Sequence, residues 1–183
     1  MKKPVSAALS VSLFALSSAL AFAQEGPPMP GPEHDLLKKD VGVWDATVEM
    51  FMAPGAAPAL SKGTETVSML GGFWQLGQFK AEMMGQPFEG LGTTGYDPAK
   101  RKYVGTWVDT MTPSIATVEA TYDAAKKTMT GIMEGVGPSG ERTKMRETTE
   151  WKDADNRVFT MYGQPGPDGK EPVAMRITYK RRR

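Results

Sequence analysis

The feature of this chain that most constrains its fold is a two-residue alternation of apolar and polar side chains. Trp44, Ala46 and Val48 alternate with polar or charged residues, and the same period returns in residues 117–122. Successive side chains of a strand point to opposite faces of a sheet, so this period predicts strands with one buried face. Antiparallel pairing is expected, because antiparallel sheets commonly bury one face and leave the other in water.

Turn-forming residues divide this pattern into ten candidate strands. Gly71-Gly72 and Asp97-Pro98 are two such breaks, and the second has the Asp and Pro of a type I turn. The strands are expected to begin near residues 43, 62, 73, 87, 101, 114, 126, 141, 156 and 171. Their spacing, mostly 11 to 15 residues, leaves no connection after residue 62 long enough for a crossover, which favours a meander.

A long meander must deal with the edges of its sheet. An open sheet would keep two unpaired edge strands, whereas closure into a barrel removes both. Leu36 and Leu37 lie among charges just before the strands, enough for one or two helical turns. We therefore predict an all-β fold: a closed, antiparallel, up-and-down barrel of about ten strands with a short N-terminal helix.

The N-terminal residues have the pattern of an export signal. Met1-Lys2-Lys3 is basic, residues 5–20 are apolar, and Ala21-Phe22-Ala23 has the small residues of a cleavage site. We expect residues 1–23 to be a signal peptide cleaved after Ala23. Residues 24–32 then form a Pro/Gly-rich tether and residues 33–183 the barrel domain. The mature protein is expected to be periplasmic or secreted, without stable membrane insertion.

Composition excludes several classes of function. The chain has no cysteine, one histidine (His34) and a net charge of +1. Thiolate chemistry is therefore impossible, and a Ser-His-Asp triad or histidine metal site would have to use His34, which we expect to be a surface or helix-cap residue. The near-neutral charge does not favour nucleic-acid binding. We predict no catalytic residues, no metal, no cofactor and no nucleic-acid partner, and an enzyme is less favoured than a binding protein.

The glycines of residues 90–95 spell G-x-G-x-x-G, a dinucleotide-binding fingerprint. That fingerprint works because a helix N-terminus after the glycines receives the pyrophosphate. Here Tyr96-Asp97-Pro98 begins a turn, and another strand follows. We interpret the glycines instead as positions where a strand bends or passes close to a neighbour.

The interior of such a barrel is predicted to be soft and apolar. Twelve methionines follow residue 23, against nine leucines and isoleucines together. Methionine fills irregular space and is common on adaptable binding surfaces, although it also serves as ordinary core filler. The hypothesis is an exported protein that binds a small, apolar, lipid-like ligand in the lumen. The candidate ligand-binding residues are Val48, Met50, Phe88, Tyr96, Trp107, Asp109, Met129 and Met175.

Three alternatives remain open. One is an outer-membrane barrel, because alternation alone does not reveal which face of the wall is apolar. Asp109 shares a strand face with Trp107, so it could be a lumen carboxylate paired with a base from another strand, either as a polar anchor or in an enzyme. If the lumen is packed, the chain would be a structural or protein-interaction module. Protein partners, oligomeric state and ligand identity leave no signal in the residues.

One closing contact follows from the expected topology. In a closed, even-numbered antiparallel barrel the end of the last strand adjoins the start of the first. This places Arg181 near Trp44, where its guanidinium could stack on the indole ring, a contact that stabilises by about 0.5–2 kcal/mol.

These residues also resemble a known family. The run Gly42-Val43-Trp44 after a short helix resembles the G-x-W signature of calycin barrels, in which the tryptophan closes the base and a late arginine packs on it. The wider pattern resembles the exported bacterial family called domain of unknown function 1579, through His34-x-x-Leu37, Gly42-x-Trp44, residues 87–97, Lys102-Tyr103-Val104, residues 106–109 and residues 166–170.

The resemblance spans about residues 33–180 and implies a calycin-like or nitrobindin-like barrel, without an established activity. The related nitrobindins hold haem through a late histidine. This chain has no histidine after His34, so haem is not expected.

Overall fold

The computed structural model describes residues 27–137 and 140–183. The predicted signal peptide and the first residues of the tether lie outside this range. One helix and ten strands follow in order: α1 (Pro32–Lys38), β1 (Gly42–Met50), β2 (Ala59–Leu70), β3 (Trp74–Met83), β4 (Gln86–Asp97), β5 (Lys102–Asp109), β6 (Ala116–Asp123), β7 (Thr128–Val136), β8 (Arg142–Trp151), β9 (Asn156–Tyr162) and β10 (Val173–Arg181).

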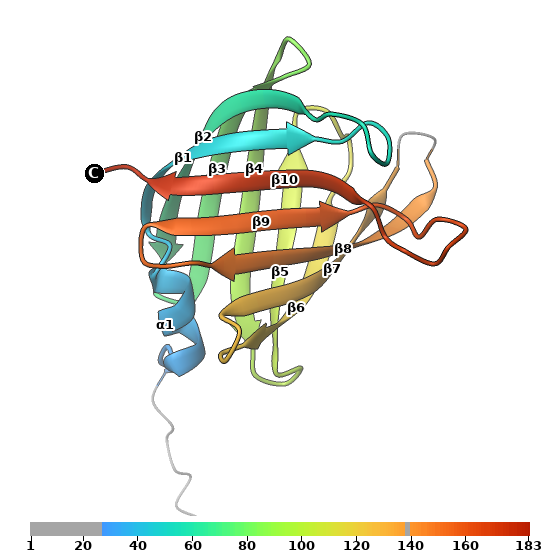
Figure 1. Ribbon diagram of the computed structural model, residues 1–183. Helices are drawn as coiled ribbons and strands as arrows, with labels where there is room; N and C mark the ends of the chain where they lie inside the picture. The colour runs from blue at the N-terminus through green and yellow to red at the C-terminus, as the bar shows by residue number, and fades with distance from the viewer. Residues whose placement is uncertain (1–26, 138–139) are drawn as a thin grey trace, which may run out of the picture.

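The strands form a closed barrel in which each pairs antiparallel with the next and β10 pairs with β1 (Figure 1). The predicted all-β, up-and-down barrel with a short helix is therefore confirmed. Closure runs from Trp44 opposite Arg181 to Met50 opposite Met175. Every expected strand start lies within three residues of the observed one. The largest difference is at β2, which begins at Ala59 because that residue already pairs with Met50.

The two faces of the barrel wall differ in polarity. Trp44, Ala46 and Val48 point inward and are buried, with exposed fractions of 0, 2 and 0%. The outer face carries ion pairs such as Lys80–Glu89, which lies across β3 and β4 with half-exposed side chains. The apolar half of the two-residue pattern therefore lines the interior.

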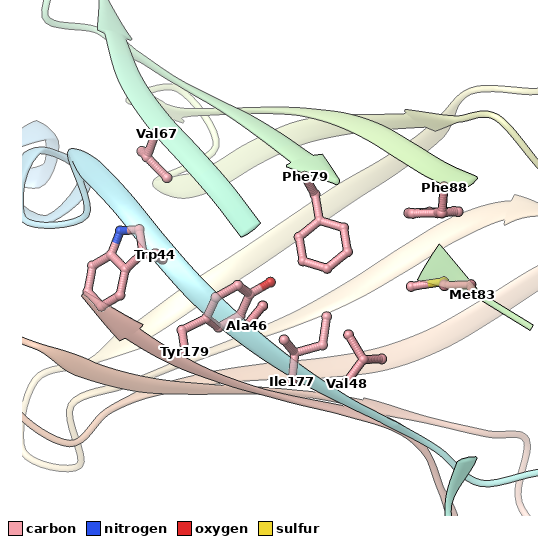
Figure 2. Close-up of a cluster of buried hydrophobic side chains, with 9 residues drawn as sticks. All are labelled: Trp44, Ala46, Val48, Val67, Phe79, Met83, Phe88, Ile177 and Tyr179. Carbon is pink, nitrogen blue, oxygen red and sulfur yellow. The ribbon is translucent and has the colours of Figure 1, made fainter. Parts of the chain in front are cut away.

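The inward side chains of β10, β1, β2, β3 and β4 form one tightly packed cluster, shown in Figure 2. Phe79 lies at its centre, with edge-to-face contacts to Phe88 at 6.1 Å and to Tyr179 at 6.4 Å between ring centroids. Such aromatic pairs add to the stabilisation from burial alone. The buried members are Trp44, Ala46, Val48, Val67, Phe79, Met83, Phe88, Ile177 and Tyr179.

Helix α1 lies at one end of the barrel (Figure 1). Its Leu36 and Leu37 are buried against Tyr103 and Ala120, in a second cluster. His34 Nδ1 accepts a hydrogen bond from the Gly31 N–H at 3.0 Å and so caps the helix. The histidine is only 8% exposed, so it is a cap residue but not a surface residue.

Within the described residues, no helix is long and apolar enough to cross a membrane.

The glycines of β4 make room for two tryptophan rings. A Cβ on Gly90 would lie 2.2 Å from the Trp107 ring, and one on Gly92 would lie 3.3 Å from it, so this indole packs flat against the inner face of the strand. Gly95, on the outer face, accommodates the ring of Trp74 in the same way. A strand follows these glycines, as expected, and their function is close packing.

Candidate functional site

Trp44 is the centre of the closed base of the barrel, next to α1. Its indole Nε1 donates to the Asp40 carbonyl oxygen at 2.8 Å, and the ring is fully buried. Arg181 lies over the ring with its Cζ 4.1 Å from the centroid, the position expected from strand pairing. The Arg181 guanidinium also donates to the Val41 carbonyl oxygen at 2.6 Å and to the Lys39 carbonyl oxygen at 2.5 Å. These bonds tie the last strand to the segment between α1 and β1.

A second arginine at the base escaped sequence reasoning. Arg157 points inward from β9, and its Cζ lies 4.7 Å from the Trp44 ring and 4.3 Å from the Tyr179 ring. Its guanidinium donates to Asp40 at 2.9 Å and also contacts the Glu65 carboxylate. The sequence signal that could have identified Arg157 as a buried residue is its inward position on a strand that is otherwise mostly apolar.

The charges at this base are buried together. Burial raises the pKa of Glu65, against the attraction of Arg157, and the nearby Asp40 raises it further. The Trp151 indole donates to the second Asp40 oxygen at 2.7 Å. Asp40 and Glu65 share the Arg157 guanidinium, and the Trp151 indole also donates to Asp40, while the buried Arg157 Nε has no hydrogen-bond partner among the described residues. The cluster is therefore a charge-paired structural network that closes the barrel.

The eight predicted ligand-binding residues do not form one site. Tyr96 and Met129 pack in the cluster beneath α1. Asp109 lies at the opposite end, where β5 ends. The others belong to the packed cluster of Figure 2 or contact it: Val48, Met50, Phe88, Trp107 and Met175.

Asp109 faces inward, but its carboxylate is bound locally. One oxygen accepts the Trp107 Nε1–H at 2.9 Å, and the other accepts the backbone N–H groups of Met111 and Thr112 at 2.9 and 2.8 Å. These donors come from its own strand and the following turn, not from a base on another strand. The arrangement fixes the Trp107 ring over Gly90 and ends β5.

Tyr96 borders a pocket of about 260 Å³ beside α1, lined by Glu33, Tyr96, Arg101, Tyr103, Thr121 and Tyr122. The Tyr103 hydroxyl donates to the Glu33 carbonyl oxygen at 3.1 Å, and burial raises the pKa of Tyr103 to about 12. This phenol therefore remains protonated at neutral pH and helps to hold α1 in place.

A larger groove of about 610 Å³ lies on the outer side of β5 to β8, next to the β9–β10 connection. Its charged side chains are paired with one another. Arg146 donates to Glu171 at 2.6 Å, and Glu119 binds Lys100 and Lys102 at 2.6 and 2.8 Å. These hydrogen bonds lower the pKa of Glu119 to about 2. The groove is a surface held together by ion pairs.

The inner wall away from α1 is lined by methionines. Cross-strand pairing joins Met50 to Met175, Met175 to Met161, and Met133 to Met145. All five side chains share the inward face and are partly exposed, unlike the fully buried Trp44 and Val48. We call this set the methionine wall: Met50, Met133, Met145, Met161 and Met175.

Glu147 is the carboxylate within the methionine wall. It points inward from β8, between Gly131 on β7 and Met161 on β9. Its Oε2 is buried and has no hydrogen-bond partner in the part of the chain that the structure describes. Burial alone raises the pKa of Glu147 to about 7. Sequence analysis missed this residue because β8 carries polar side chains on both faces, so no alternation marks which face is inward.

The residues do not fit a haem held through histidine. His34 is the single histidine, its Nδ1 is used in capping α1, and its ring packs edge-on against Phe73 and Tyr96 at 5.3 and 6.3 Å. Residues 27–137 and 140–183 also contain no group of three or more Asp, Glu or His side chains placed to hold a metal ion.

Known structures share the fold of this chain. A crystal structure of Rv2717c from M. tuberculosis is similar over 85% of this chain and 100% of that chain, with a TM-score of 0.63 and 12% identity. The S-type phycobiliprotein lyase CPES from Guillardia theta is similar over 82% of this chain and 93% of its own, with a TM-score of 0.51 and 12% identity. At these identities the likeness concerns the barrel alone.

No curated protein sequence matches the chain significantly. A family model described as "Protein of unknown function (DUF1579)" matches residues 29–181, which is most of the barrel together with α1. This agrees with the resemblance seen in the sequence. The chain therefore belongs to the DUF1579 family.

Proposed function

We propose that this chain is an exported protein that binds a small, mainly apolar, lipid-like molecule at the methionine wall inside the barrel. The observation that carries the proposal is the contrast within the lumen: rigid aromatic packing around Phe79, but partly exposed methionines on the methionine wall, which runs from β7 through β10 to β1. Unbranched thioether side chains can rearrange around an apolar guest at small cost.

The polarity of the barrel supports a ligand inside it. Most buried inward residues are apolar and the outer face carries charged pairs such as Lys80–Glu89, the reverse of the lipid-facing pattern of outer-membrane barrels. Ligands commonly bind in the mouths of β-barrels.

Export is supported by the signal-like residues 1–23. N-terminal sequencing of the periplasmic or secreted protein tests it, and the sequence obtained should begin at Gln24.

Native mass spectrometry of gently extracted protein tests ligand binding directly. We expect a co-purifying apolar molecule, or saturable binding of the neutral fluorophore N-phenyl-1-naphthylamine if the protein has lost its ligand. The variant Met133→Trp fills the wall and should reduce probe affinity by about tenfold, equivalent to about 1.4 kcal/mol.

The matched control is Ile132→Trp, which places the same side chain one residue away on the outer face, where Ile132 is 43% exposed. This variant should bind the probe like the parent protein. Absence of both a co-purifying molecule and probe binding would refute the proposal, as would equal losses of affinity in the two variants.

A further inference from the structure

Glu147 is the one inward carboxylate on the wall from β7 to β9 in the described residues, and no side chain of the neighbouring strands neutralises it. Arg157, the inward cation of β9, is held by Asp40 and Glu65 at the base. Lys144 and Arg146 of β8 lie at alternate positions and therefore point outward, where they pair with Glu134 and Glu171.

The inward positions that face Glu147 are uncharged on every strand packed against it. They are Met129, Gly131 and Met133 on β7, Phe159 and Met161 on β9, and Met145 and Thr149 on β8 itself. A buried ionised carboxylate without a counter-ion is unfavourable, and its protonated form still requires a hydrogen-bond partner. Among residues 27–137 and 140–183, Oε2 has neither a cation nor a hydrogen-bond donor.

The space next to this carboxylate is also unusual. Gly131 lies directly opposite Glu147, and a Cβ there would be 3.3 Å from Oε1 and 3.0 Å from the Ala120 Cβ. With no side chain on Gly131 and a small one on Ala120, the wall has little bulk on one side of the carboxylate. Methionines occupy the inward positions between Glu147 and the barrel end opposite α1, so the apolar part of a bound ligand would lie against them.

We propose that Glu147 is the binding residue for the polar group of the lumen ligand, and that this ligand is an amphiphile with a protonated amine, whose ammonium supplies the missing counter-ion. The inference rests on the proposed function and narrows its ligand class. A fatty acid is disfavoured, because its carboxylate would lie beside the carboxylate of Glu147. An ammonium would form a charge-assisted hydrogen bond in an environment of low dielectric constant.

Three probes with the same alkyl chain separate the alternatives: dodecylamine, dodecanol and dodecanoic acid, each measured by displacement of N-phenyl-1-naphthylamine from the full mature protein. At pH 8 we expect dodecylamine to bind about tenfold or more tightly than dodecanol, and dodecanoic acid to bind most weakly. The preference for the amine over the alcohol should disappear in Glu147→Gln. The outward variant Glu134→Gln should keep the preference.

The pH dependence gives a second measurement that needs no variant. Since burial raises the pKa of Glu147 to about 7, its carboxyl is neutral at pH 5.5 and ionised at pH 8, whereas an alkylamine stays protonated throughout. The ratio of amine to alcohol affinity should therefore fall as the pH is lowered.

Three outcomes would each overturn the inference while leaving the proposed function intact. They are equal affinities for amine and alcohol at pH 8, a preference that survives Glu147→Gln, and tightest binding of dodecanoic acid. If none of the three compounds binds, both fall.

Discussion

Two inward charges on neighbouring strands differ in their surroundings. Arg157 on β9 contacts two carboxylates and two aromatic rings at the base beside α1. Glu147 on β8, farther from that base, faces methionines and a glycine, and the described residues give it no counter-ion. Both side chains are in the interior of one barrel, yet only the arginine is neutralised by the protein.

The difference separates a structural region from a candidate binding region. A buried charge that is paired with opposite charges holds its neighbours in one arrangement, whereas a buried charge without a counter-ion leaves an interaction for another molecule to make. The base also has rigid aromatic side chains around Phe79, while the methionine wall has flexible ones. The barrel therefore combines a fixed core with an adaptable wall.

The largest effect is expected from removing the paired charge. Arg157→Ala would leave Asp40 and Glu65 buried without their cation, which should reduce the free energy of unfolding by about 3–5 kcal/mol in urea titrations. The control is Arg176→Ala, because Arg176 is 41% exposed and lies 3.7 Å from its partner Glu49. That variant should lose about 1 kcal/mol or less. Similar losses in both variants would show that the base is not a tightly coupled network.

The same comparison shows which features of the fold and of the site could be predicted from the sequence. Strand number, closure and the contact between Trp44 and Arg181 follow from the two-residue period and from the pairing of the last strand with the first. Those features depend on local pattern and topology. Arg157 was not singled out, because its partners Asp40 and Glu65 are 117 and 92 residues away in the chain.

Glu147 could not be found for a different reason. In β8, polar residues such as Thr148 and Thr149 occupy both faces, so the inward face is set by pairing with β7 and β9 and not by its own pattern. Asp109 shows the converse. The inward direction of Asp109 was predictable from Trp107. Its hydrogen bonds with the Trp107 indole and with the backbone of the following turn depend on local geometry that the strand pattern does not contain.

An intermediate effect is expected from the pH dependence of stability. The pKa of Glu147 is about 7 in the folded chain, against an ordinary value of 4.5 for glutamate in water, so the folded state binds the proton more tightly than the unfolded state. The resulting stabilisation is complete below about pH 4.5 and is lost as the pH rises through 7. Without ligand, the parent protein should lose up to about 3 kcal/mol more than Glu147→Gln between pH 4.5 and pH 8. Urea midpoints across this range measure the difference, and parallel curves would contradict the assignment.

The smallest expected effect is the difference in stability between Gly→Ala variants at two inward glycines, Gly90 on the packed side of the barrel and Gly131 beside Glu147. Gly90→Ala places a Cβ 2.2 Å from the Trp107 ring, which is held by its hydrogen bond to Asp109, so the ring must move and that bond must weaken. We expect a loss of about 1–3 kcal/mol in urea unfolding. In Gly131→Ala the nearest atoms are 3.0 and 3.3 Å away and include the Glu147 carboxylate, whose side chain can shift, so the loss should be smaller. An equal or larger loss at Gly131 would mean that the wall around Glu147 is as rigid as the packed side, and that a ligand could not displace it.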